Sequence, residues 1–327
     1  MMGDTSVGRA KHNNTDLARL LLEQLWGLCV KSRSKEADLL MEYYNAKNVI
    51  LDPGSACPTS HDEVLDLVSM LKTNRDETLH DLQLSVITNR QKYAWLSNQA
   101  EREVREALKF AASMWLMVAT SDWSENETLP EYIQRSLPSN SLAASDMRAE
   151  FRVTARSLNH IAGIEILWSS NLKEHLKYDQ NQRMLTLFRH ASFLKERVSS
   201  GYPRGFLHET AATLALLFPY GESPHKRWNK RVRRGAEPDV EIGLAASASR
   251  NPQDYPYWGR HLVTIQQAFD ASKPQTLRQW VYDKRDSNQF YTFWFAVIAI
   301  ALTLFFGLIQ STTAVFQVIR ALLSQRS

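Results

Sequence analysis

Two histidines are the residues of this chain whose types and positions could do chemistry. His175 follows a strand-like apolar segment at 164–170, and His190 follows a second such segment at 183–188. A neutral imidazole pair near Glu174 could act as an acid–base pair or hold a metal ion. Neither histidine lies in an HExxH or catalytic-triad pattern, and a structural or surface role is the favoured alternative. His175 and His190 are therefore the only catalytic candidates, and no metal ligands are assigned.

Motifs that carry known chemistry are otherwise missing. The chain has no GxGxxG, GxxxxGK[ST] or GxSxG segment, so no cofactor is expected. Its two cysteines, Cys29 and Cys57, are too few for a disulfide scaffold, and no CxxC or HxxxH spacing supplies a zinc site. The formal net charge of +4 over 327 residues is too mild to predict nucleic-acid binding.

A basic run surrounds Trp228. Near a membrane, each of its Lys and Arg residues would contribute about 1 kcal/mol of attraction to anionic lipid headgroups. The alternative, favoured for charge runs in general, is a solvated helix face partly balanced by acidic residues at 237, 239 and 241. The candidate membrane-surface contacts are Lys226, Arg227, Lys230, Arg231, Arg233 and Arg234.

Helical periodicity predicts that residues 14–285 form a soluble, mainly α domain. Residues 1–13 are polar and predicted to be disordered, and a sub-boundary is possible near 121–141. Ser60 and Glu63 match a capping box, while the apolar stripe in residues 99–120 favours a central buried helix. The strand-like segments predict at most a small β element. Other helices are expected near 15–32, 35–46, 76–87, 145–157, 190–198, 205–218, 257–272 and 274–285.

The C-terminal part contains an uncharged run from residue 287 to residue 319. Its core, residues 290–309, is about 20 residues long, which is the length that crosses a bilayer as a helix. Small residues recur at every fourth position, and such a stripe allows a second copy or another membrane helix to approach closely. The alternative is the ordinary frequency of small residues in membrane spans. The stripe consists of Ala299, Thr303, Gly307 and Ser311, and residues 320–327 form a short tail.

The charges that flank the span predict its orientation. Lys273, Arg278, Lys284 and Arg285 precede it, whereas only Arg320 and Arg326 follow it. Because positive residues favour the cytosolic side, we expect a single-pass tail anchor with the large N-terminal domain in the cytosol. Glycosylation of Asn126 in cells would contradict this orientation.

Four segments together resemble a group of uncharacterised single-span membrane proteins of filamentous fungi. They are IEILWSSNLKEHL at 164–176, FRHASFL at 188–194, FLHETAATLALLFP at 206–219 and YTFW at 291–294. The resemblance covers about residues 95 to 320. It implies a fungal membrane protein and brings no assigned activity with it.

These observations favour a membrane-anchored, non-enzymatic interaction or scaffold protein that acts at the cytosolic membrane surface. Its expected partners are the lipid bilayer and either a second copy of the chain or another membrane helix. Two alternatives stay open. One is an accessory protein or unfamiliar enzyme of a fungal pathway, tethered to the membrane, and the other is a peripheral regulator that uses the basic run.

Overall fold

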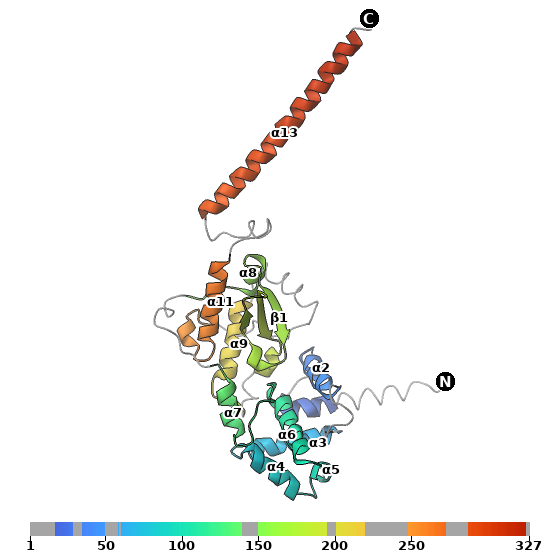
Figure 1. Cartoon of the computed structure of the whole chain (residues 1–327), viewed down its shortest axis with the longest axis vertical. Helices are drawn as coiled ribbons and strands as arrows, with labels where there is room; N and C mark the ends of the chain where they lie inside the picture. The colour runs from blue at the N-terminus through green and yellow to red at the C-terminus, as the bar shows by residue number, and fades with distance from the viewer. Residues whose placement is uncertain are drawn as a thin grey trace, which may run out of the picture. The chain divides into compact units, whose positions relative to one another are not determined.

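The structure, a computed structural model, describes residues 17–28, 35–49, 58, 60–97, 99–138, 150–194, 201–219, 248–272 and 287–324. It is mainly α, with one small sheet and one long C-terminal helix, as the sequence predicts (Figure 1). The chain divides into two compact units. The globular unit comprises Met1–Leu158 and Ile164–Ala271, and the tail unit comprises Asn159–Gly163 and Ser272–Ser327.

The first half of the globular unit is helical. The predicted capping box is confirmed at the start of α3, where Ser60 Oγ accepts a hydrogen bond from Glu63 N and Glu63 Oε2 accepts one from Ser60 N. Thr128 and Glu131 form the same capping box at α7, while at α4 Thr78 Oγ1 accepts a hydrogen bond from Asp81 N and donates one to Asp81 Oδ2. Residues 17–26 are helical, followed by α2 (Lys35–Val49), α3 (His61–Thr73), α4 (Leu79–Thr88), α5 (Ala94–Ser97), α6 (Glu101–Leu116) and α7 (Leu129–Ser136).

Helix α6 lies at the centre of this half, where α3, α4 and α5 pack against it. Its predicted stripe is buried, because Val104, Leu108, Ala111, Ala112 and Trp115 are at most 1% exposed. The helix ends at Leu116 rather than near residue 120 as expected. Met117 adopts a left-handed conformation with φ of 50°, and the Leu116 and Met117 carbonyl oxygens accept hydrogen bonds from Tyr202 and Leu172. Long-range partners therefore replace the last turn of the helix.

The second half is built around a three-stranded sheet. Strands β1 (Glu165–Ser169) and β3 (Met184–Phe188) pair in parallel and match the two segments predicted from the sequence. The third strand, β2 (Lys177–Asp179), lies on the other side of β3 and pairs with it in antiparallel fashion. It was not anticipated, because three residues are too few to show an alternating pattern.

Short helices and two longer ones complete this half. Helix α9 packs against η3, and α11 packs against β2. The helix expected at 145–157 is wrong over residues 150–154, which are not helical, and the one expected at 190–198 is a short 3-10 helix where it is described. The basic run and the expected helix at 274–285 lie outside the described residues. The elements are α8 (Ala155–His160), η2 (Leu172–Glu174), η3 (Ala191–Leu194), α9 (Phe206–Leu217), η5 (Pro252–Asp254) and α11 (Gly259–Ala271).

The long C-terminal helix is α13 (Ser287–Ser324), which belongs to the tail unit. Its residues Tyr291–Gln317 are long and apolar enough to cross a membrane, and none of their most apolar window is buried within the described structure. Large apolar side chains such as Phe295 and Phe316 are 71% and 75% exposed. By its length and composition, this helix could cross a membrane.

Candidate functional site

Both candidate histidines lie inside the globular unit, and each is only 1% exposed. Both contact Phe188. The Phe188 backbone N–H donates a hydrogen bond to His175, and the Phe188 ring contacts the His190 ring edge-on. Burial lowers the pKa of each imidazole to about 3, with smaller contributions from His261 at His175 and from Arg189 at His190. Both rings are therefore neutral at physiological pH.

Both ring nitrogens of His175 are engaged. Its Nδ1 accepts a hydrogen bond from Phe188 N at 3.2 Å, which leaves the proton on Nε2. Nε2 lies 2.8 Å from Thr213 Oγ1, and that hydroxyl donates to the Thr210 carbonyl oxygen at 2.7 Å. His175 thus ties β3 to α9 with no nitrogen left for a substrate proton or a metal ion.

The ring of Trp258 extends this network toward α11. It contacts the His175 ring edge-on, with 4.8 Å between centroids, and its Nε1 donates to Thr210 Oγ1 at 2.8 Å. The Glu209 carboxylate accepts hydrogen bonds from the backbone N–H groups of Tyr257 and Trp258 at 2.8 and 2.7 Å. Burial raises the pKa of Glu209, although these two bonds act in the opposite direction. The cluster holds η2, β3, α9 and α11 together.

His190 has a different environment. Its Nε2 lies 3.0 Å from Ser170 Oγ, and its ring contacts Tyr43 of α2 edge-on at 5.5 Å between centroids. Its Nδ1 is buried and has no hydrogen-bond partner among the described residues. Among these residues, no group of three or more His, Cys, Asp or Glu side chains could hold a metal ion. The two histidines therefore share a neighbour but no hydrogen bond that could make them an acid–base pair.

A second polar cluster, missed from the sequence, surrounds Tyr132 of α7. Lys173 Nζ donates to the Tyr132 hydroxyl at 2.9 Å, and this hydroxyl lies 2.9 Å from Asp122 Oδ1. Lys173 and Arg135 also lie over the Tyr132 ring at 4.8 and 5.4 Å from its centroid. Burial, followed by the Asp122 carboxylate, raises the pKa of Tyr132. Its hydroxyl therefore stays protonated and links α7 to η2 instead of acting as a base.

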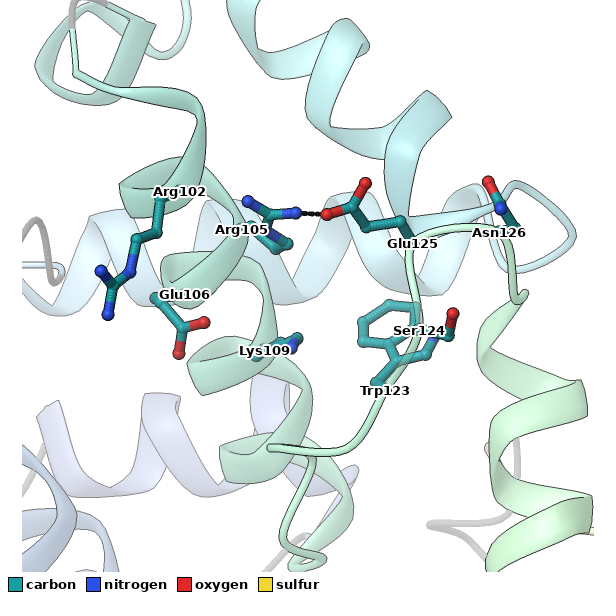
Figure 2. A pocket seen from close by; sticks show the side chains of 8 residues that line it. All are labelled: Arg102, Arg105, Glu106, Lys109, Trp123, Ser124, Glu125 and Asn126. Carbon is teal, nitrogen blue, oxygen red and sulfur yellow. Dashed lines mark ion pairs between the residues drawn. The ribbon is translucent and has the colours of Figure 1, made fainter.

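A surface depression of about 530 Å³ lies between α6 and the loop that leads to α7 (Figure 2). Arg105 of α6 forms an ion pair with Glu125 of the loop across it, and Lys109 Nζ donates to the Ser121 carbonyl oxygen at 3.1 Å. The Trp123 ring is only 2% exposed, so it forms the floor. Figure 2 shows the Arg102 guanidinium pointing away from the ion pair. Within the depression, these polar contacts of Arg105 and Lys109 are therefore made to the chain itself.

The predicted packing stripe lies on α13, where Ala299, Thr303, Gly307 and Ser311 are all exposed. Thr303 Oγ1 donates to the Ala299 carbonyl oxygen of its own helix at 2.8 Å. A Cβ atom placed on Gly307 would meet nothing within 4 Å, so this chain leaves that face open. The other predicted contacts, Lys226, Arg227, Lys230, Arg231, Arg233 and Arg234, lie outside the described residues.

Comparisons with protein-family models, with curated proteins and with solved structures find no match to this chain.

Proposed function

We propose that this chain is a membrane-anchored, non-enzymatic interaction or scaffold protein whose N-terminal domain acts at the cytosolic membrane surface. The observation that carries the proposal is α13, which exposes a span of apolar residues from Tyr291 to Gln317. At about 1.5 Å per residue, the span is longer than the hydrocarbon layer of about 30 Å. A soluble domain would leave this surface in water, where a large exposed apolar patch is unfavourable.

The interior of the globular unit supports the non-enzymatic part of the proposal. His175 has both ring nitrogens in internal hydrogen bonds, and Glu209 accepts two backbone N–H groups. The Tyr132 hydroxyl interacts with Asp122 and Lys173 in the same internal manner. These groups use their hydrogen-bonding capacity to join secondary-structure elements, and a catalytic group needs part of that capacity for its substrate.

Membrane extraction tests the anchor. We expect the full-length chain to remain in the membrane pellet after an alkaline carbonate wash and to enter solution only in detergent. A chain that ends at Ser272 is the matched control and should be fully soluble. Release of the full-length chain by carbonate would overturn the anchor.

The orientation is tested with glycosylation in microsomes. Asn126 precedes Glu127 and Thr128 and is a natural acceptor sequence in the globular unit. With the domain in the cytosol, Asn126 stays unmodified, while an acceptor sequence added on a spacer after Ser327 is glycosylated. The opposite pattern would place the domain in the lumen.

The scaffold role is tested by purifying a tagged full-length chain from mild detergent. We expect it to retain either a second, differently tagged copy or a defined membrane partner. Recovery of neither, from extracts in which the chain is folded, would contradict this role.

A further inference from the structure

Small residues of α13 share one face of the helix with Gln310 and Gln317. Positions seven apart lie about two turns apart, on nearly the same side of a helix. Gln310 and Gln317 are related in this way, and the same series continues back to Thr303 and Ala296. The turns between them carry Gly307 and Ala314 on this side. The opposite side is bulky and exposed, with Ile298, Phe305, Ile309 and Phe316.

Hydrogen bonding distinguishes Gln310 and Gln317 from three threonines of the helix. Thr303 donates to Ala299 O, Thr312 to Leu308 O and Thr313 to Ile309 O, at 2.8 to 3.0 Å. These hydroxyls are satisfied by their own helix and can face hydrocarbon at little cost. The side-chain amides of Gln310 and Gln317 have no such bond among the described residues, and both residues are exposed.

The depth of each glutamine in the bilayer determines how strongly its side chain needs a hydrogen-bond partner. A hydrocarbon layer of about 30 Å accommodates about 20 helical residues. Centred on the span Tyr291–Gln317, it encloses Gln310 and leaves Gln317 near the interface. An unpaired carboxamide in hydrocarbon is unfavourable by several kcal/mol on transfer scales, whereas one at the interface can bind water. Gln310 therefore needs a partner inside the membrane.

The chemistry of this face favours an identical helix as the partner. A carboxamide both donates and accepts, so it can bond to its own copy. Two copies anchored in the same orientation have parallel helices, and a two-fold axis then brings each residue close to its counterpart. Gly307, one turn away, allows the two backbones to approach closely enough for this contact.

We propose that α13 pairs in parallel with α13 of a second copy of this chain through this face, with the two Gln310 carboxamides hydrogen-bonded across the axis. The proposal rests on the membrane anchoring proposed above and names the partner of that anchor. The lipid-facing side of the dimer is then the side of Phe305 and Phe316.

Energy transfer between labelled full-length chains in phosphatidylcholine vesicles measures the pairing over a series of protein-to-lipid ratios. We expect Gln310→Leu to raise the dissociation constant about 3- to 30-fold, the range found for one polar contact between membrane helices. Gln317→Leu should have a smaller effect. Thr312→Val is the matched control, because its hydroxyl is already bonded within the helix, and it should change the constant less than twofold.

Disulfide cross-linking locates the interface without removing the glutamine. In a chain with Cys29→Ser and Cys57→Ser, we expect Ala314→Cys to give a covalent dimer on oxidation in membranes, and Phe305→Cys to give none. Stronger cross-linking of Phe305→Cys would overturn the proposed face.

Flotation of the same vesicles distinguishes failure of the membrane anchor from failure of the helix pairing. A chain that does not float with lipid overturns both the anchor and the pairing. A chain that floats but stays monomeric at every ratio overturns the pairing alone. Equal effects of Gln310→Leu and Thr312→Val, or a monomeric chain bound to a different membrane helix, would also overturn it.

Discussion

The globular unit and α13 satisfy their polar side chains in opposite ways. Inside the globular unit, the Thr213 and Thr210 hydroxyls bond to the His175 ring and the Trp258 indole, over 38 and 48 residues in sequence. On α13, the threonines bond only to carbonyl oxygens three or four residues earlier, and Gln310 has no partner among the described residues. The polar groups of the globular unit find partners within that unit, whereas the carboxamide of Gln310 finds none in the described part of the chain.

This difference suggests that the globular unit determines the folding stability of the protein, while α13 determines its membrane association. The globular unit contains a buried core and a connected polar network, which are sufficient reasons for a domain to fold by itself. Helix α13 forms because a continuous helix satisfies its own backbone, and its most apolar window is not buried among the described residues. Changes in one region should therefore leave the other unaffected, and the following predictions test this.

Truncation should give the largest effect. A chain that ends at Ser272 should lose membrane association completely, yet keep a cooperative unfolding transition by circular dichroism. Replacing residues 287–324 with an unrelated apolar helix of about 20 residues should restore the association. Loss of cooperative unfolding in the truncated chain would show that the tail is part of the fold.

His175→Phe should destabilise the globular unit by about 3 kcal/mol or more. It leaves the buried Phe188 N–H without a partner, at about 1–3 kcal/mol, and removes the bond from His175 Nε2 to the Thr213 hydroxyl, which keeps only its bond to the Thr210 carbonyl oxygen. Urea unfolding of the truncated chain measures this loss, and Thr213→Val, which removes one of the two bonds, should cost roughly half as much. Membrane association of the full-length variant should not change. A loss below 1 kcal/mol would contradict the role given to His175.

Local patterns predicted much of the fold and little of the site. The Ser60 capping box, the α6 stripe and the long apolar helix are all readable because their signals lie within a few turns of chain. The partners of His175 lie 13 and 38 residues away, and no spacing rule connects them. Glu209 offered a signal that the sequence analysis did not use. A carboxylate in the apolar helix 206–217 requires hydrogen-bond donors, and the backbone N–H groups of Tyr257 and Trp258 provide them.

Acid should weaken the globular unit through the two histidines. Their pKa is about 3 in the folded chain and near the ordinary 6.5 when unfolded, so between these values the unfolded chain binds more protons. The stability is complete above pH 6.5 and is lost as the pH falls toward 3. From pH 7 to pH 5 the loss should be about 2 kcal/mol per histidine, measured by urea unfolding of the truncated chain. Equal stability at both values would contradict the buried, neutral state.

His190→Phe should have the smallest effect, although His190 is as buried as His175. The substitution loses one bond to Ser170, but it also removes the buried Nδ1 that has no partner in the described part of the chain. A phenyl ring can keep the edge-on contacts with Tyr43 and Phe188. The two changes offset each other, so we expect a loss of about 1 kcal/mol or less.

The same variant also tests how the acid sensitivity is divided between the two histidines. Without His190, one of the groups that bind protons on unfolding is gone, and the loss between pH 7 and pH 5 should fall by about 2 kcal/mol. An effect of His190→Phe as large as that of His175→Phe would mean that Nδ1 of His190 has a partner. That outcome would give His190 the same structural role as His175, with both ring nitrogens in internal hydrogen bonds.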